Sequence, residues 1–133
     1  LKRYARPDDR IMVISDAVFS MDGDIAPLPE MIDIMSNYEG SVLVMDEAHA
    51  SGALGKTGRG IYEHFNISPQ DAIRRGVMPV IMTTFSKFAA SAGAAISSHV
   101  AELIPLLNVS PTSIGTISVS YTHLTPVSYT HLT

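Results

Sequence analysis

The sequence predicts an α/β fold with a mostly parallel sheet and flanking helices. Three continuous apolar runs, Ile11 to Ile14, Val42 to Met45 and Val80 to Met82, are separated by helical and glycine-rich patterns. None of these runs alternates between apolar and polar residues, and continuous apolar runs are typical of strands that helices bury on both faces. A length of 133 residues with 46% hydrophobic content is sufficient to bury a core.

The segment between the first two runs predicts a helix. Pro29 stands where a helix can begin, apolar residues from Met31 to Met35 recur at helical spacing, and Gly40 can end the helix. This part of the chain is therefore a strand, a loop, a helix and a second strand.

The segments after the second run are less regular. A glycine-rich stretch from Gly52 to Gly60 precedes a short helical candidate at Tyr62 to Phe65 and a polar linker near Pro69. After the third run, an alanine-rich segment through Ala95 and a patterned run from Val100 to Leu107 indicate further helix and strand.

The C-terminal stretch differs in kind from the rest. The heptapeptide Val119 to Thr125 is repeated without change at Val127 to Thr133, with Pro126 between the copies. Two such short copies cannot supply the buried faces of a stacked repeat, and the string resembles a translated sequencing-library adapter. We therefore expect residues 1–118 to be a fragment of a larger domain and residues 119–133 to be an artefactual tail. The tail histidines have no scaffold that would fix a metal site.

Composition argues against several classes of partner. The net charge of −4 arises from scattered residues without basic runs, which disfavours nucleic acid and anionic membrane surfaces. The chain has no cysteine, and no apolar stretch approaches the ~20 residues that span a bilayer. A reducing cytoplasm is the expected location.

Polar clusters directly follow each of the three apolar runs, at Asp16 to Asp24, Asp46 to His49 and Thr84 to Lys87. Ligands of open parallel sheets bind outside the carboxyl ends of the strands, so these clusters are candidate site residues. Lys87 is the lysine that follows a predicted buried strand. An amine that forms a Schiff base must lose its proton, which partial burial favours. Taken alone, Lys87 would more often be a solvated lysine at the start of a helix, and the other two clusters favour the Schiff-base interpretation.

Asp46 ends a strand of Val, Leu, Val and Met, where a carboxylate requires a cationic partner. The protonated pyridine nitrogen of pyridoxal 5′-phosphate (PLP) is one such partner, and its protonation makes the ring an electron sink. The alternative interpretation of Asp46 is the N-cap of a helix.

Three motifs together resemble the α-oxoamine synthase family of fold type I PLP-dependent enzymes. They are Ser20-Met-Asp-Gly-Asp-Ile-Ala-Pro-Leu-Pro29, Asp46-Glu-Ala-His49 with Gly55-Lys-Thr-Gly-Arg-Gly60, and Thr84-Phe-Ser-Lys87. The resemblance runs from about Arg10 to Ser98 and implies the central part of the PLP-binding large domain.

The resemblance also implies a role for each candidate residue. Lys87 corresponds to the Schiff-base lysine and general base, and Asp46 to the partner of the pyridine nitrogen. His49 corresponds to a hydrogen-bond donor to the phenolic oxygen, Ser20 to a serine beside that oxygen, and Thr84 to a phosphate ligand. In the intact parent this implies condensation of an amino acid with an acyl-CoA, with release of CoA and CO2, in a homodimer.

An aminotransferase or a lyase of the same fold would share the aspartate and the lysine, and the isolated chain could be inactive because a residue that stacks on the cofactor and an arginine for the substrate carboxylate are not visible. Phe88 also stands where the family usually has a small residue, and the linker with Asp71 to Gly76 is longer than usual.

A nucleotide-binding interpretation is disfavoured. Val44 to His49 resembles the Walker B box of DEAH helicases, and Ala50 to Thr57 fits a loose P-loop pattern. A P-loop precedes Walker B in the chain and opens a helix, whereas here the order is reversed and Gly58 and Gly60 oppose a helix.

Overall fold

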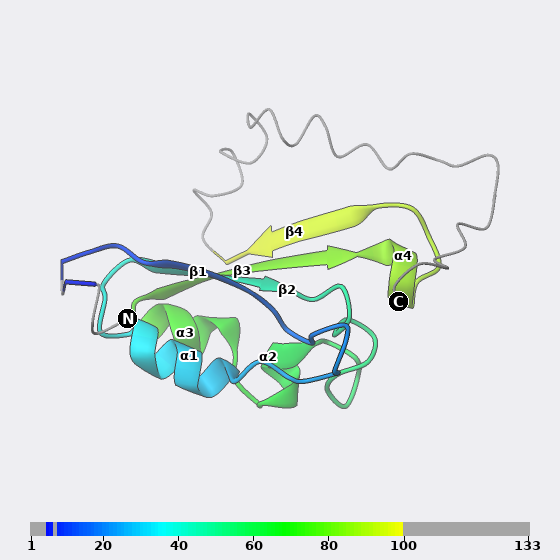
Figure 1. Ribbon diagram of the computed structural model, residues 1–133, viewed down its shortest axis with the longest axis horizontal. Coiled ribbons are helices and arrows are strands. Elements are labelled where there is room, and N and C mark those ends of the chain that lie inside the picture. The colour runs from blue at the N-terminus through cyan, green and yellow to red at the C-terminus, as the bar shows by residue number, and fades with distance from the viewer. Residues whose placement is uncertain (1–4, 7, 100–133) are drawn as a thin grey trace, which may run out of the picture.

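The computed structural model describes residues 5–6 and 8–99, which form a four-stranded mixed sheet. The strands are β1 (Met12–Asp16), β2 (Ser41–Asp46), β3 (Val77–Thr84) and β4 (Ala94–Ser98). They lie in the order β1-β2-β3-β4, with the first three parallel and β4 antiparallel to β3 (Figure 1). The expected α/β fold with a mostly parallel sheet is confirmed.

The helices are α1 (Leu28–Met35), α2 (Ile61–His64), α3 (Pro69–Arg74) and α4 (Phe85–Phe88). Figure 1 shows α1, α2 and α3 on one side of the sheet and α4 at the carboxyl end of β3. No helix in this described part of the chain is long and apolar enough to cross a membrane.

Helix α1 forms where the apolar spacing predicts it. A proline lies in its first turn, where the missing N–H has no intrahelical partner to lose, and Leu28, Ile32 and Met35 form its buried face. The side-chain amide of Asn37 donates to the carbonyls of Asp33 and Ile34 and so satisfies groups at the helix end.

Helix α3 corrects the expectation of a polar linker near Pro69. Ser68 Oγ accepts a hydrogen bond from Asp71 N (3.2 Å), and Asp71 Oδ2 accepts one from Ser68 N (2.9 Å). This reciprocal capping box, with Pro69 in the first turn, starts a helix with only Ala72 fully buried. The added residues of this segment therefore form a helix that packs against β3.

Strand β3 begins earlier than its apolar run because it tolerates a proline. Ser98 Oγ donates to the Pro79 carbonyl (3.0 Å), so that carbonyl faces the β4 side of the strand. Backbone pairing with β4 starts only at Val80. The absent N–H of Pro79 therefore removes no ladder hydrogen bond.

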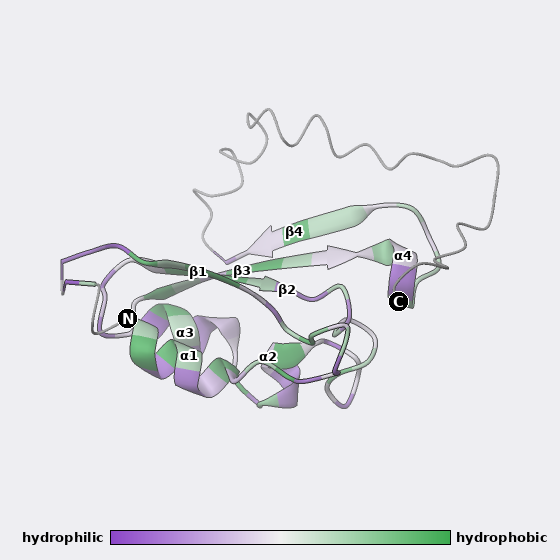
Figure 2. Ribbon diagram, viewed as in Figure 1, coloured by the Kyte–Doolittle hydropathy of each residue, from purple (hydrophilic) through white to green (hydrophobic). Residues whose placement is uncertain are grey.

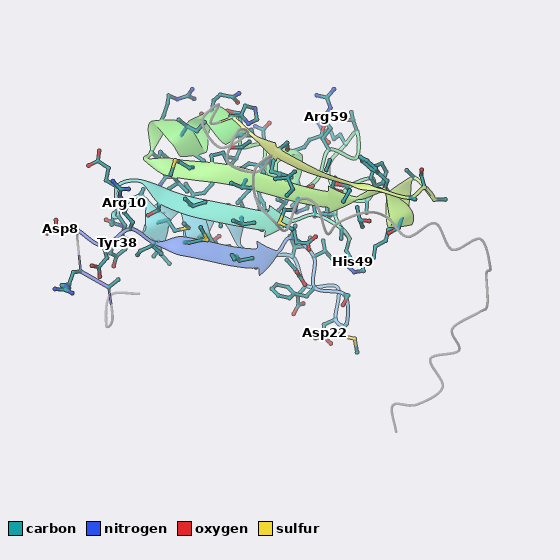
Figure 3. All side chains as sticks on the ribbon, turned by 90° about the horizontal axis from the view of Figure 1, so that it is seen from above. Asp8, Arg10, Asp22, Tyr38, His49 and Arg59 are labelled. Carbon is teal, nitrogen blue, oxygen red and sulfur yellow. The ribbon has the colours of Figure 1, made fainter. Side chains whose placement is uncertain are left out.

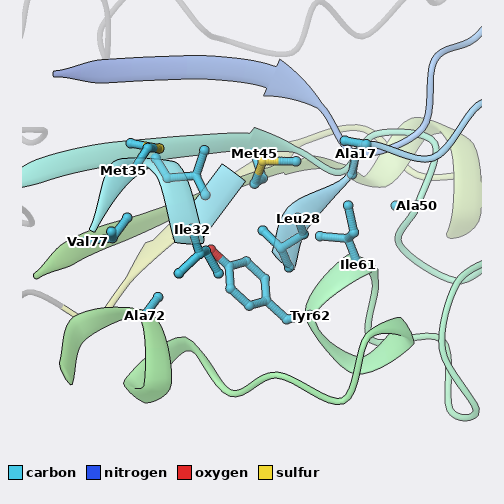
Figure 4. Close-up of a cluster of buried hydrophobic side chains, with 12 residues drawn as sticks. Ala17, Leu28, Ile32, Met35, Met45, Ala50, Ile61, Tyr62, Ala72 and Val77 are labelled. Carbon is cyan, nitrogen blue, oxygen red and sulfur yellow. The ribbon is translucent and has the colours of Figure 1, made fainter. Parts of the chain in front are cut away.

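The core lies between the sheet and the three helices (Figure 4). Leu43, Met45 and Val77 of the sheet are fully buried there, together with Leu28 and Ile32 of α1. The sequence predicts helices on both faces, but in the described residues they cover only one. On the other face Met12 is 63% exposed and Ile14 69% exposed. Figure 2 shows hydrophobic colouring along β1 and the first part of β3, whereas α4 carries both hydrophobic and hydrophilic colouring.

Candidate functional site

The three predicted polar clusters meet at one edge of the sheet. Because β1, β2 and β3 are parallel, their carboxyl ends lie side by side, with Asp16 opposite Asp46 and Asp46 opposite Met82. Figure 3 shows Asp22 and His49 beyond this edge, at the opposite end of the sheet from Arg10. The register therefore explains how clusters far apart in the sequence come to one place.

Asp46 is the last residue of β2 and is partly buried. Its Oδ1 accepts a hydrogen bond from Ala48 N (2.9 Å), which fixes the side chain over the turn that follows. Its other carboxylate oxygen accepts no hydrogen bond from the residues that the structure describes. Asp46 thus organises the turn, as a cap does, and keeps one oxygen available for another partner.

His49 and Lys87 line the same cavity. The carbonyl of Glu47 accepts hydrogen bonds from Ala50 N (3.0 Å) and Ser51 N (2.9 Å), and this turn carries His49 on its exposed side. The cavity is about 280 Å³, and its walls are Ala48, His49, Ser51, Gly52, Ala53, Lys87 and Phe88. A titratable imidazole and a primary amine therefore share one space at the carboxyl edge.

Lys87 reaches this space because the chain changes from strand to helix within one residue. Thr84 is the N-cap of α4, and its Oγ1 accepts a hydrogen bond from Ser86 N (3.3 Å). The Thr84 hydroxyl also donates to the Gly93 carbonyl (3.3 Å). Thr84 is thus at the predicted edge but does not line the cavity, and its hydroxyl already has partners.

Ser20 lies in a separate loop at the same edge. An isolated bridge joins Val18 to Ile25, and Phe19 N donates to the Asp24 carbonyl (2.9 Å), so the chain folds back between these residues. Ser20 is exposed at the turn and is not among the cavity residues. Of the five predicted residues, the structure brings His49 and Lys87 into one cavity, and Ser20, Asp46 and Thr84 are not among the residues that line it.

Phe88, which departs from the family pattern, forms part of the cavity wall. A Cβ atom added at Gly52 would lie 2.8 Å from Phe88 Cβ, and Gly52 has a φ of +80°. Gly52 is thus the residue that lets the phenyl group approach the loop. Phe88 also makes an edge-to-face contact with Phe85, with ring centroids 6.0 Å apart.

Sequence reasoning missed the residues that support the cavity wall. Glu47 is 2% exposed, and desolvation by its surroundings raises the pKa of its carboxyl group. Its Oε2 accepts a hydrogen bond from Ser51 Oγ (3.4 Å), which in turn accepts one from Thr83 Oγ1 (2.9 Å). The signal was available in the alternation of side chains, since the neighbour of Asp46 must point to the opposite, helix-covered face.

A family model described as Aminotransferase class I and II matches residues 1–128. The chain belongs to the aminotransferase class I and II family. Its similarity to the 8-amino-7-oxononanoate synthase of Nitrosospira multiformis is 48% identity over 87 residues, which is 65% of this chain and 22% of the relative. For the 8-amino-7-oxononanoate synthase of Fervidobacterium nodosum it is 57% over 58 residues, 44% of this chain and 14% of the relative. The matched part of the chain thus spans 22% and 14% of the length of these two relatives.

Solved structures of the same fold confirm the expected resemblance to the α-oxoamine synthase group within the aminotransferase class I and II family. Serine palmitoyltransferase of Sphingomonas wittichii has a TM-score of 0.63 at 30% identity and covers 80% of this chain and 25% of its own. 8-Amino-7-oxononanoate synthase of Francisella tularensis has a TM-score of 0.57 at 27% identity, and the match covers 75% of this chain and 27% of that protein.

The predicted tail, residues 119–133, and the run from Val100 to Leu107 lie outside the described residues.

Proposed function

We propose that residues 1–118 belong to the PLP-binding large domain of a longer enzyme that condenses an amino acid with an acyl-CoA and releases CoA and CO2. The observation that carries this proposal is the cavity shared by His49 and Lys87 at the carboxyl edge of the sheet. Asp46 ends the neighbouring strand β2 with one carboxylate oxygen available. Support for the reaction comes from relatives named 8-amino-7-oxononanoate synthase and serine palmitoyltransferase.

The chemistry of the side chains fits PLP. The cofactor carries an aldehyde, a basic ring nitrogen, a phenolic oxygen and a phosphate, and the edge offers an amine, a carboxylate, an imidazole and hydroxyl groups to meet them. When bound, PLP supplies an electron sink for the negative charge that develops at the α-carbon of an amino acid.

Each residue then has a defined task. Lys87 Nζ would hold the cofactor at its aldehyde carbon, with loss of water, and in its free amine form would accept the proton of the substrate α-carbon. The available oxygen of Asp46 would keep the ring nitrogen protonated. His49 would donate a hydrogen bond to the phenolic oxygen, and Ser20 would assist at the same oxygen. Thr84 would hold the phosphate with its hydroxyl in place of the Gly93 carbonyl, to which it now donates.

The partners of this enzyme are an amino acid, an acyl-CoA and a second copy of the longer protein, and its compartment is the cytoplasm. A PLP-dependent aminotransferase is the second candidate, because the matching family model is described as Aminotransferase class I and II. The two functions differ in their second substrate. Release of CoA from an acyl-CoA supports the condensation, and transfer of the amino group to a 2-oxo acid supports the aminotransferase.

The proposal is tested by Lys87→Ala in the longer enzyme, with Lys56→Ala as the matched control. Lys56 lies in the glycine-rich loop and is absent from the cavity of His49 and Lys87. We expect Lys87→Ala to abolish the borohydride-sensitive visible absorbance of the cofactor and nearly all turnover, because the amine that attaches the cofactor is lost. The Lys56→Ala enzyme should keep both. Survival of the absorbance band in Lys87→Ala would contradict the proposal.

A further inference from the structure

Glu47 directly follows Asp46 in the chain but points to the other side of the sheet. Among the residues that the structure describes, it is the one charged residue with a fully buried side chain. A buried carboxylate is unfavourable unless hydrogen bonds replace its water shell. Its partners therefore show what it holds together.

Those partners come from three different segments. Glu47 Oε1 accepts a hydrogen bond from Ile61 N (3.1 Å) at the start of α2. Glu47 Oε2 accepts one from Ser51 Oγ, whose oxygen accepts from Thr83 Oγ1 of β3 (2.9 Å). The backbone adds to this link, because Glu47 N donates to the Met82 carbonyl (2.7 Å).

The last residue of the glycine-rich loop, Gly60, packs closely against this carboxylate. A Cβ atom at Gly60 would lie 1.6 Å from Glu47 Oε2, and Gly60 has a φ of +87°. Only glycine fits a position that combines this backbone conformation with so close an approach. Both ends of the loop, at Ser51 and at Gly60, are thus fixed against one side chain.

We propose that Glu47 is a positioning residue for the site described above: its carboxylate holds the turn that carries His49 in a fixed relation to the end of β3, which leads to Lys87. This inference rests on the proposed function. Glu47 is not among the cavity residues, so it acts through Ser51, which lines the cavity and bonds to both Glu47 and Thr83.

The directions of the hydrogen bonds show which substitutions keep the connection from Glu47 through Ser51 to Thr83 and which break it. Glu47→Gln keeps an oxygen for Ile61 N, and its amide donates to Ser51 Oγ, which then donates to Thr83 Oγ1. The connection survives with its direction reversed. Glu47→Ala removes the connection, and Ser51→Ala interrupts it without touching Glu47. Glu63→Ala is the matched control, because Glu63 binds the tip of the same loop through Thr57 and Arg59.

The experiment compares these variants in the longer enzyme. Amide exchange is measured on the cofactor-free protein, and visible circular dichroism, kcat and KM on the PLP-loaded protein. For Glu47→Ala we expect faster exchange at residues 48–51 and 83–87, an altered cofactor dichroism band, and a kcat lower by about tenfold or more at a KM within about threefold. Glu47→Gln should restore kcat to within about threefold of the wild type. Glu63→Ala should speed exchange at residues 55–59 alone.

Each result decides the inference. It is overturned if Glu47→Ala lowers thermal stability but leaves exchange at residues 83–87, the dichroism band and kcat as in the wild type. If Glu47→Ala does not fold, Ser51→Ala decides by the same readouts. If wild-type enzyme shows no cofactor band, the proposed function fails, and the exchange comparison still shows whether Glu47 couples the turn to β3.

Discussion

Two carboxylates hold the glycine-rich loop, and they lie in opposite environments. Glu63 is exposed, and its pKa is lowered by hydrogen bonds from Thr57 Oγ1 and from the backbone N–H groups of Thr57 and Arg59. Glu47 is buried, and desolvation raises its pKa, although the hydrogen bonds of Ile61 and Ser51 oppose the shift. Acid should therefore change the contributions of the two side chains to folding stability in opposite directions.

At the residue scale we predict that Glu47→Gln raises the stability of the protein at pH 7. A carboxyl group with a raised pKa destabilises the folded state above that pKa, and this penalty vanishes as the pH falls below the unfolded value of 4.5. The advantage of Glu47→Gln should accordingly shrink in acid, as measured by urea unfolding across the pH range. Glu63→Gln should do the reverse: the contribution of a carboxylate with a lowered pKa is present above 4.5 and is lost below its folded pKa. A Glu47→Gln protein less stable than wild type at pH 7 would contradict the prediction.

A second prediction at this scale concerns Gly60. Gly60→Ala adds a methyl group where a Cβ atom would lie 1.6 Å from Glu47 Oε2, at a φ of +87°. We expect it to lower the free energy of unfolding by about 2–4 kcal/mol, since it adds a clash to backbone strain. Gly40→Ala is the control, because Gly40 also has a positive φ (+72°) but no atom within 4 Å of the added Cβ.

Gly40→Ala should cost only about 1 kcal/mol, from backbone strain alone. Urea unfolding of both variants gives the comparison. Equal losses at Gly60 and Gly40 would show that the carboxylate moves aside readily.

At the scale of elements, α3 depends on its first turn. Ser68→Ala removes the side chain that accepts from Asp71 N, and we expect it to lower the free energy of unfolding by about 1 kcal/mol. Ser36→Ala is the control, since Ser36 Oγ only donates to the Asp33 carbonyl at the end of α1. Urea unfolding and amide exchange in residues 69–75 check the effect. Unchanged exchange in α3 would contradict the role of the cap.

Elements that depend on burial were predictable from the sequence, and those that depend on capping were not. The run Val42 to Met45 predicts β2 because all of its side chains are apolar. Helix α3 was missed because only Ala72 is fully buried, so its apolar periodicity is weak, although Ser68 and Asp71 form a capping box. The first residues of β3 were missed because Pro79 is unusual in a strand.

The sequence likewise predicts some features of the candidate site and not others. Parallel strands with polar residues at their ends predict that Asp46 and Thr84 lie at one edge, and the register bears this out. The shared cavity of His49 and Lys87 depends on the path of two loops. That path is set by the contacts of Ser51 and Thr83, which join residues far apart in the sequence and leave no local pattern.

At the scale of the whole molecule, one face of the sheet is not covered by any helix among the described residues, and we call it the open face. Met12 and Ile14 are exposed there, and parallel sheets normally have both faces covered. We predict that the isolated chain of 133 residues self-associates through this face. The paired substitution Met12→Lys and Ile14→Lys should shift it toward monomer in sedimentation experiments.

Ile34→Lys is the matched control for this pair. Ile34 is 48% exposed but lies on α1, away from the open face, so its substitution should leave association unchanged. Association that persists in the Met12 and Ile14 variant would place the contact elsewhere.

The strand order β1-β2-β3-β4 also bears on how the chain folds during synthesis. Each strand pairs with the one that precedes it along the chain, so no strand waits for a partner made much later. Such sequential pairing keeps loop closure short and favours fast folding. When β4 leaves the ribosome, the neighbours that align Asp46 with β3 have already been made. The edge that carries His49 and Lys87 can therefore assemble before later parts of a longer protein exist.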